Sequence, residues 1–222
     1  MDFVFAALVG YIIGMAPVAL RMAKSRGIDL RNVGTGNVGT SNAYRYTGKS
    51  IGALTLIIDM GKGYLSPLLV NFIGMDLGPQ LLASIGAITG QMWPVTSKFQ
   101  GGRGNATAGG ACFYFDQVSF FIAMTFFVTT TFPKIYKILR SSHSETVIRS
   151  RMVPITVILA FIIYGLLSMN AGNGIVGLGA VSFILLILVR RATAPWPPDP
   201  ITGAIPNKSL FNTLLLDRPD SN

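Results

Sequence analysis

Charged residues are scarce in this chain of 222 residues. Only 12% of the positions are charged, about half of the share that is usual in a soluble domain, whereas 50% are hydrophobic. This balance excludes an ordinary soluble globular domain. The formal net charge is +9, but no long basic run is present, so we interpret the excess as a signal for membrane orientation and expect no nucleic-acid partner.

Cysteine and histidine are almost absent as well. The single Cys112 lies in an apolar run, which excludes a disulfide framework. The single His143 lies in a basic segment, and we interpret it as a solvated loop residue rather than a catalytic base. The first apolar run has no basic segment before it and is long enough to cross a membrane, so we expect a span and no cleavable signal peptide.

Apolar runs fill most of the chain up to residue 189. Within one of them, Gly86 and Gly90 are four positions apart, a small-residue spacing that lets two helices pack closely. We therefore predict an all-α integral membrane protein. The runs cover residues 3–23, 50–72, 78–95, 106–132, 153–169 and 174–189.

The run at 106–132 is interrupted by Asp116 and Gln117, and the basic residues favour two helices there. With a turn at this point the chain has seven spans, some of them short or re-entrant, and every Lys and Arg except Lys62 falls outside the spans on one side. By the positive-inside rule that side is cytoplasmic. We therefore predict an outside N-terminus, one membrane domain over residues 1–190, and an irregular, proline-containing cytoplasmic tail over 191–222.

The longest polar stretch before the tail is residues 27–48, which we name the first glycine-rich segment. It holds five glycines, three asparagines and two arginines. Glycine allows the backbone to approach a ligand closely, and successive N–H groups in such a segment form a concavity that binds anions. Because arginine matches phosphate in fork geometry, the pattern predicts a phosphate-binding loop at the membrane surface.

Two other interpretations apply to this segment. Residues 34–39 match G-x-G-x-x-G, and Asp59 follows at the distance that a dinucleotide site would need. That context fails, since no strand precedes the glycines and Asp59 lies inside an apolar run. The remaining alternative is a plain glycine-rich turn between two helices.

Residues 90–107 form a second glycine-rich segment with Arg103 and a helix start behind it. The first turn of that helix would offer N–H groups to an anion, although an ordinary loop with basic residues is the alternative. Both segments are predicted on the inward face, so a site for two phosphates or an extended phosphate is plausible. Asp59 and Lys62 share one face of the second span and are either part of the site or a buried structural ion pair.

The two segments resemble a known family, the bacterial acyl-phosphate-dependent glycerol-3-phosphate acyltransferases of the PlsY type. The first family motif is G-x-D-x-R-x-x-G-S-G-N-x-G-A-T-N-x-x-R-x-x-G, and Asp59 and Lys62 match the family's second span. The residues that match or replace the first motif here are Gly27, Asp29, Arg31, Gly34, Thr35, Gly36, Asn37, Gly39, Thr40, Ser41, Asn42, Arg45 and Gly48.

The resemblance implies transfer of a fatty acyl group from acyl phosphate to the 1-hydroxyl of glycerol 3-phosphate, which makes lysophosphatidic acid for phospholipid synthesis. It also implies a bacterial cytoplasmic membrane, membrane lipid as the surroundings, and neither a metal nor a cofactor. Arg45 and Arg103 would hold phosphate, while Thr35 and Asn37 would orient the reacting groups. The residues expected to bind substrate are Gly34, Gly36, Gly39, Ser41, Asn42, Gly101, Gly102, Gly104, Thr107, Asp59 and Lys62.

The sequence departs from the family pattern at three places. Gln91 stands where the second motif has histidine, and Gln100 and Arg103 stand where its F-K-G-G-K-G has lysines, so that one charge is lost and one kept. The third motif, R-H-x-x-N-I, is replaced by residues 190–195 without its histidine and asparagine. These departures leave a second hypothesis open. The chain would then be a non-catalytic homologue that serves as a structural or lipid-binding subunit of a larger membrane complex.

Overall fold

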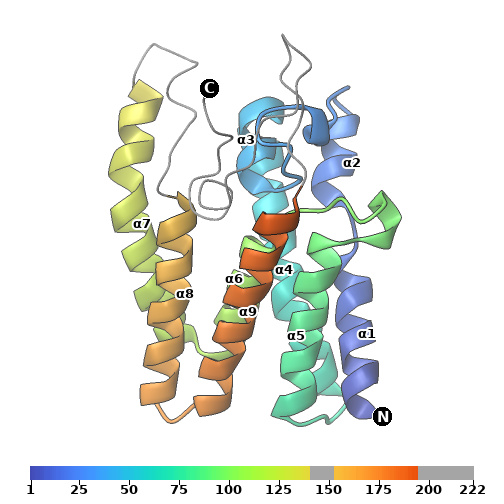
Figure 1. The fold of residues 1–222 in the computed structure, drawn as a ribbon, viewed down its shortest axis with the longest axis vertical. Helices are drawn as coiled ribbons and strands as arrows, with labels where there is room; N and C mark the ends of the chain where they lie inside the picture. The colour runs from blue at the N-terminus through green and yellow to red at the C-terminus, as the bar shows by residue number, and fades with distance from the viewer. Residues whose placement is uncertain (141–152, 195–222) are drawn as a thin grey trace.

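The computed structural model describes residues 1–140 and 153–194, and this part of the chain is built from helices without strands. The longer helices run side by side along one axis (Figure 1). Their bounds are α1 Asp2–Gly14, α2 Val18–Lys24, α3 Thr40–Thr47, α4 Lys49–Phe72, α5 Leu77–Met92, α6 Asn105–Phe115, α7 Gln117–Arg140, α8 Val153–Asn170 and α9 Gly174–Thr193, with short 3-10 helices η1 Leu30–Asn32 and η2 Val95–Ser97.

Several helices have the length and composition of membrane spans. Three stretches are long and apolar enough to cross a bilayer, namely Asp2–Lys24, Lys49–Phe72 and Gly174–Thr193, and Gln117–Phe132 and Ile155–Asn170 are shorter apolar helices. Large apolar side chains such as Ile57 and Leu166 point outward and are more than 60% exposed. A helix satisfies its own backbone groups, so such helices are stable in lipid. The observed fold is that of an all-helical membrane protein.

The structure divides the run at 106–132, as the sequence predicts. Helix α6 ends at Phe115 and α7 begins at Gln117, with Asp116 in an extended conformation between them. The Asp116 carboxylate accepts a hydrogen bond from the Ser119 N–H at 3.0 Å, which caps the first turn of α7. It also accepts one from the Ser168 hydroxyl of α8 at 2.7 Å. A polar N-cap therefore separates two apolar helices here.

The span predicted over residues 3–23 is found as an apolar stretch over Asp2–Lys24, but it is not one continuous helix. The chain breaks after α1 and restarts as α2, because Pro17 has no N–H to continue the helix. Carbonyl groups at the break accept hydrogen bonds from side chains that are distant in the sequence. The Thr96 hydroxyl donates to the Met15 carbonyl at 2.8 Å, and the Lys62 ammonium donates to the Ala16 carbonyl at 2.7 Å. Apolar composition alone carries no sign of this break.

The C-terminal boundaries also differ from those expected. Helix α7 continues to Arg140, eight residues past the end of its apolar run, and α9 continues to Thr193, past the predicted boundary at residue 190. A shift of this size at a helix end is common. The predicted irregular tail, from residue 195 onward, and His143 lie outside the described residues.

Glycines allow the helices to touch backbone to backbone. A Cβ on Gly10 or Gly14 of α1 would lie within 2.0 Å of the Ala83 or Ala87 carbonyl oxygen of α5. On the opposite side of the same contact, Gly86 and Gly90 face the backbone of α1, as their spacing predicts. Helices α4 and α6 make the same kind of backbone contact at Gly63 and Gly110. These contacts fix the positions of the helices that carry the loops.

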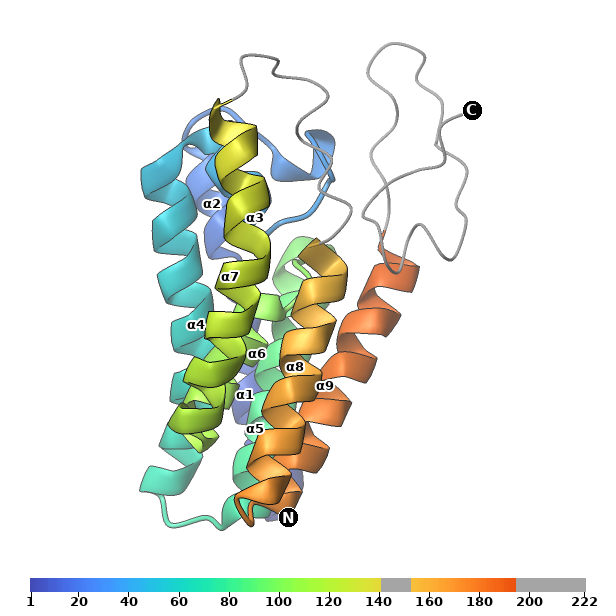
Figure 2. The ribbon, with the colours of Figure 1, turned by 90° about the vertical axis from the view of Figure 1, so that its left-hand side faces the viewer.

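Both glycine-rich segments lie in the same half of the molecule. Figure 1 shows α2 and α3 at the end opposite the N-terminus, and the α5–α6 connection leaves the bundle beside the break between α1 and α2. Figure 2 shows the connections α4–α5 and α8–α9 at the other end. The fold therefore brings segments that are separated by about 40 residues in the sequence to one place.

Candidate functional site

The first glycine-rich segment begins with a charged turn. The Asp29 carboxylate accepts hydrogen bonds from the Arg31 backbone N–H at 3.1 Å and from its Nε at 2.9 Å. The pKa of Asp29 is lowered to about 2, chiefly by the hydrogen bond from the Arg31 side chain. The bond from the Arg31 backbone and the positive charges of Arg31 and Lys24 lower this pKa further, whereas burial raises it. Asp29 is therefore ionised at neutral pH and caps the N-terminus of η1.

Asn42 organises the rest of this segment. Its amide nitrogen donates to the carbonyl oxygens of Leu30 and Val33, both at 3.0 Å, and its amide oxygen accepts from the Thr35 N–H at 3.4 Å. Gly34 passes so close that a Cβ there would lie 2.5 Å from this oxygen. The side chain is 2% exposed and holds its own segment in shape. Direct contact between Asn42 and substrate, which the sequence suggested, is therefore not what this geometry favours.

The second half of the segment is a helix and not a loop, which corrects the sequence-based expectation. Thr40–Thr47 forms α3, with Gly39 as its N-cap in an extended conformation. Ser41 and Arg45 are exposed on α3, while Thr35, Gly36 and Asn37 are partly buried in the turn before it. The N–H of Gly36 donates to the Val33 carbonyl at 3.1 Å, so that group is engaged within the turn.

The second glycine-rich segment folds back on the end of α5. The N–H of Gly101 donates to the Met92 carbonyl at 3.2 Å, and that of Gly102 donates to the Gln91 carbonyl at 2.9 Å. A Cβ on Gly101 would lie 2.2 Å from the Gln91 carbonyl oxygen, so only glycine fits. We expected Gly101 and Gly102 to bind substrate, but their N–H groups cannot line an anion pocket in this structure, because both are engaged with α5.

Arg190 at the end of α9 holds this segment from the other side. Its Nε donates to the Gly102 carbonyl at 3.1 Å and its Nη2 to the Gly101 carbonyl at 2.8 Å, while the guanidinium lies 5.7 Å from the centroid of the Trp93 ring. Arg190 is 5% exposed. The sequence did not reveal this role, although Arg190 matches the arginine of the family's third motif.

The N-termini of α3 and α6 converge where the two segments meet. A Cβ on Gly102 would lie 2.7 Å from the Val38 carbonyl oxygen, so these two residues are in contact. Val38 directly precedes Gly39, the N-cap of α3, and Gly102 lies two residues before Gly104, the N-cap of α6. Neither glycine supplies a side-chain cap. The first-turn N–H groups of a helix attract anions when no side chain caps them.

The first turns of these two helices contain buried oxygen atoms without hydrogen-bond partners. They are Thr40 Oγ1 on α3 and Asn105 Oδ1 and Thr107 Oγ1 on α6, three of the six buried side-chain atoms in the described part of the chain that lack a partner. Buried polar atoms in native proteins are nearly always bonded, so a group of exceptions indicates a place for a polar ligand. Arg103 precedes α6 by two residues, and its charge acts on Arg190. This junction is the candidate site.

Asp59 and Lys62 form part of a closed polar network inside the bundle. Lys62 donates to Asp59 Oδ1 at 2.9 Å and to Gln91 Oε1 at 2.7 Å, and Gln91 Nε2 donates to Asp59 Oδ2 at 3.1 Å. All three side chains are at most 8% exposed. Of the two interpretations of the pair, the geometry favours the structural ion pair over substrate binding. Gln91, in the place of the family's histidine, completes the network.

We expect Lys62→Met to destabilise the protein strongly. It would leave Asp59 buried without its counter-charge and remove one of the two donors to the Ala16 carbonyl, which keeps the Val18 N–H. Breaking a buried pair in this way costs about 3–5 kcal/mol. Thermal unfolding in detergent micelles would measure the effect, with exposed Lys49→Met as the matched control. The double variant Asp59→Asn with Lys62→Met should recover part of the loss. Equal melting temperatures for Lys62→Met and the control would contradict this assignment.

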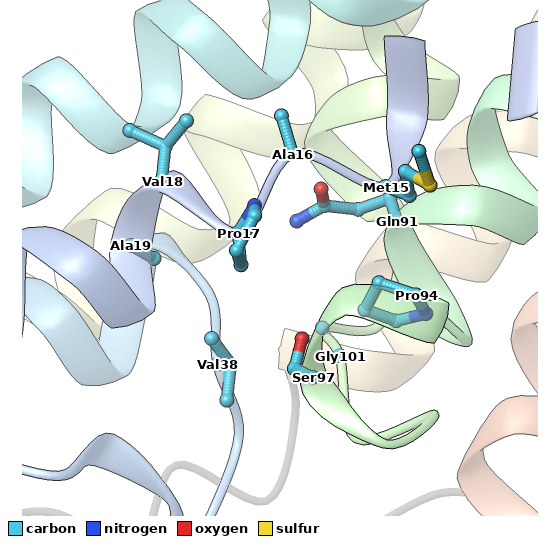
Figure 3. Close-up of a pocket in the computed structure, with 11 residues that line it drawn as sticks. Met15, Ala16, Pro17, Val18, Ala19, Val38, Gln91, Pro94, Ser97 and Gly101 are labelled. Atoms are coloured by element: carbon cyan, nitrogen blue, oxygen red, sulfur yellow. The ribbon is translucent and has the colours of Figure 1, made fainter. Parts of the chain in front are cut away.

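A small cavity opens between the two segments and the break in the first span (Figure 3). Eleven residues line it, and it is partly open to solvent, with room inside for about one water molecule. Its walls include Met15, Pro17, Val38 and Pro94, with Gln91 and Ser97 as the polar side chains. The Gln91 amide thus joins the buried network to the site. Among the described residues, no group of His, Cys, Asp or Glu is arranged to hold a metal ion.

The site belongs to a helical membrane protein in which glycine residues are the N-caps of two neighbouring helices, α3 and α6. The family model for glycerol-3-phosphate acyltransferase matches residues 4–194, and the chain belongs to this family. It is 31% identical over 233 residues to "Glycerol-3-phosphate acyltransferase 4" of Dehalococcoides mccartyi, which covers 98% of this chain and 90% of that relative. A match to "Glycerol-3-phosphate acyltransferase" of Exiguobacterium sibiricum, 36% identical, spans 59% of this chain and 63% of the relative.

Solved structures show the same fold. The crystal structure of PlsY (YgiH), an integral membrane glycerol 3-phosphate acyltransferase, in its glycerol 3-phosphate form aligns with a TM-score of 0.72 and 29% identity. The lysophosphatidic acid form of that protein aligns with a TM-score of 0.70 and 27% identity. Each alignment covers 86% of this chain and 88% of the other. The family suggested by the glycine-rich motifs is confirmed, and the alternative of a non-catalytic subunit gains no support.

Proposed function

We propose that this protein transfers a fatty acyl group from acyl phosphate to the 1-hydroxyl of glycerol 3-phosphate in the bacterial cytoplasmic membrane. Membership of the glycerol-3-phosphate acyltransferase family supports the reaction, and the solved relative binds glycerol 3-phosphate and lysophosphatidic acid. The observation that carries the proposal is the junction of the α3 and α6 N-termini, where buried oxygen atoms lack partners. Such a junction suits phosphate-bearing substrates.

The chemistry needs little beyond positioning and charge stabilisation. The 1-hydroxyl oxygen attacks the carbonyl carbon of the acyl phosphate, the bond between that carbon and the bridging oxygen breaks, and phosphate leaves. Gln91 cannot act as a base, and neither can the arginine at position 191 near neutral pH. The hydroxyl proton therefore passes to the departing phosphate. Aligning two bound reactants and neutralising charge supply most of the catalysis.

The roles follow from where the residues lie. Arg45 on α3 and Arg103 before α6 bind the phosphate groups, with the first-turn N–H groups of both helices behind Gly39 and Gly104. Asn37, Thr35, Ser41 and Thr107 contact the substrates around this charge. The remaining glycines, Asn42 and the Asp59–Lys62 pair hold the segments in place and act as positioning residues. The residues of the family motifs are thus divided into those that contact the substrates and those that hold the segments in position.

The reaction is tested by the substrate dependence of phosphate release. We expect purified protein in lipid or detergent to release phosphate from palmitoyl phosphate only when glycerol 3-phosphate is present, and to form lysophosphatidic acid in equal amount. Release that does not depend on glycerol 3-phosphate would indicate a simple phosphatase and contradict the proposal. Binding of both ligands without turnover would return weight to a non-catalytic role.

Arg45→Lys should weaken glycerol 3-phosphate binding. Lysine keeps the positive charge but loses the planar fork that binds two phosphate oxygens at once. We expect KM for glycerol 3-phosphate to rise by roughly tenfold, which corresponds to the loss of one charge-assisted hydrogen bond. Exposed Arg21→Lys on α2 is the matched control and should change nothing. An unchanged KM would remove Arg45 from the site.

We further propose seven spans with the N-terminus outside. The positive-inside rule supports this topology, as does the placement of both glycine-rich segments in one half of the bundle. In a Cys112→Ala background, Ser25→Cys should react with a membrane-impermeant thiol reagent only from the cytoplasmic side, and Gln117→Cys only from outside. Both positions are exposed. Labelling of the two cysteines from the same side would exclude the seven-span topology.

A further inference from the structure

Ser97 places an unpaired hydroxyl group in the cavity. The residue ends η2, is 7% exposed, and its Oγ is buried without a hydrogen-bond partner. Figure 3 shows this hydroxyl directed into the space between Val38, Pro94 and Gln91. Gln91, the other polar side chain there, is already bonded to Lys62 and Asp59. A buried hydroxyl without a partner marks a place where a ligand completes the hydrogen bond.

The walls of the cavity determine what kind of group fits. None of the eleven lining residues, all in the described part of the chain, carries a formal charge, and Met15, Ala16, Pro17, Val18 and Pro94 present apolar surface. Such walls suit neither a phosphate nor the hydroxyl-rich glycerol. They suit an uncharged polar atom that is followed by hydrocarbon. Gly101 and Gly102 line the same cavity, so this group lies directly beside the proposed phosphate site.

An acyl phosphate has this sequence of groups, with phosphate, then a carbonyl, then an alkyl chain. We propose that the Ser97 hydroxyl donates a hydrogen bond to the carbonyl oxygen of the acyl donor. This inference rests on the proposed function and assigns to Ser97 a contact with the acyl donor alone.

Ser97→Ala tests the contact through the two Michaelis constants. The variant loses no hydrogen bond within the protein, so the melting temperature in micelles should not fall. We expect KM for palmitoyl phosphate to rise by roughly three- to tenfold, the range for one lost neutral hydrogen bond, while KM for glycerol 3-phosphate stays unchanged. Ser97→Cys keeps the shape with a weaker donor, and its KM for palmitoyl phosphate should lie between those of the wild type and the alanine variant.

Ser84→Ala is the matched control. Ser84 lies on α5 and is fully buried, but its hydroxyl donates to the Gln80 carbonyl at 3.1 Å, away from the cavity lining. We expect neither Michaelis constant to change in this variant. A rise in KM for glycerol 3-phosphate in Ser97→Ala, or no change in either constant, would overturn the proposal.

A binding measurement separates this inference from the proposed function. Palmitoyl phosphate should stabilise the wild-type protein against heat, and the concentration needed for half of the effect should be several-fold higher for Ser97→Ala. This readout does not require turnover. If the wild type is inactive but shows this difference, the proposed reaction is wrong while the Ser97 contact stands. Equal stabilisation of the two proteins excludes the contact, even when the wild type is active.

Discussion

Replacing Gly101 by alanine is expected to reduce turnover by at least about a hundredfold. The new Cβ would lie 2.2 Å from the Gln91 carbonyl oxygen and 2.5 Å from Pro94 Cδ, so the α5–α6 connection must move. That shift would break the bonds from Gly101 and Gly102 to the end of α5 and displace Arg103 and the N-terminus of α6. Misplacing catalytic groups by about 1 Å can cost about 10²-fold in rate.

Gly61→Ala provides the control for this change. Gly61 lies in α4 with open space around its Cβ position, and alanine there should be neutral or should stabilise the helix by up to about 1 kcal/mol. Phosphate release under saturating substrates would be compared for both variants, together with melting temperatures. Full turnover by Gly101→Ala would show that the position of the second glycine-rich segment does not matter for catalysis.

Arg190→Lys is expected to lose most of the activity even though the charge is kept. Arginine bonds the Gly101 and Gly102 carbonyls at once with two nitrogen atoms and also lies over Trp93. The single ammonium group of lysine cannot reproduce this planar contact. One carbonyl is left buried without a donor, at a cost of about 1–3 kcal/mol, and the segment gains freedom. We expect turnover to fall by roughly ten- to a hundredfold.

The readout for Arg190 should separate positioning from direct binding of substrate. A positioning residue lowers kcat for both substrates together, whereas a phosphate ligand would chiefly raise one KM. Exposed Arg26→Lys serves as the control and should behave as wild type. A selective rise in KM for glycerol 3-phosphate, with kcat unchanged, would show that Arg190 contacts the substrate and would contradict the positioning role.

The helices that form the membrane part could be predicted because their apolar runs are long and their ends are marked by polar residues. The boundary at Asp116 was predictable for this reason. The break at Pro17 does not show in the apolar pattern, which continues on both sides of it; its sign in the sequence is the proline itself. Its stability depends on Thr96 and Lys62, which are distant in the sequence.

The candidate site was predictable at the level of segments and not at the level of atoms. Glycine spacing identified both glycine-rich segments, since close backbone approach leaves a pattern in the sequence. It could not show that Asn42 bonds Leu30 and Val33, or that Gly101 and Gly102 direct their N–H groups toward α5. Those bonds depend on how the chain folds back. The cavity beside Ser97 arises only where three distant segments meet.

The ion pair of α4 also bears on how the chain enters the bilayer. A lone lysine or aspartate at the centre of a membrane helix costs about 2.5–3.5 kcal/mol on insertion scales. Asp59 and Lys62 are three residues apart on the same helix, so each already has its counter-ion before any neighbouring helix has been docked. Gln91 is synthesised about thirty residues later. Helix α4 can therefore be inserted as a neutral unit during synthesis, and α5 then completes its hydrogen bonds.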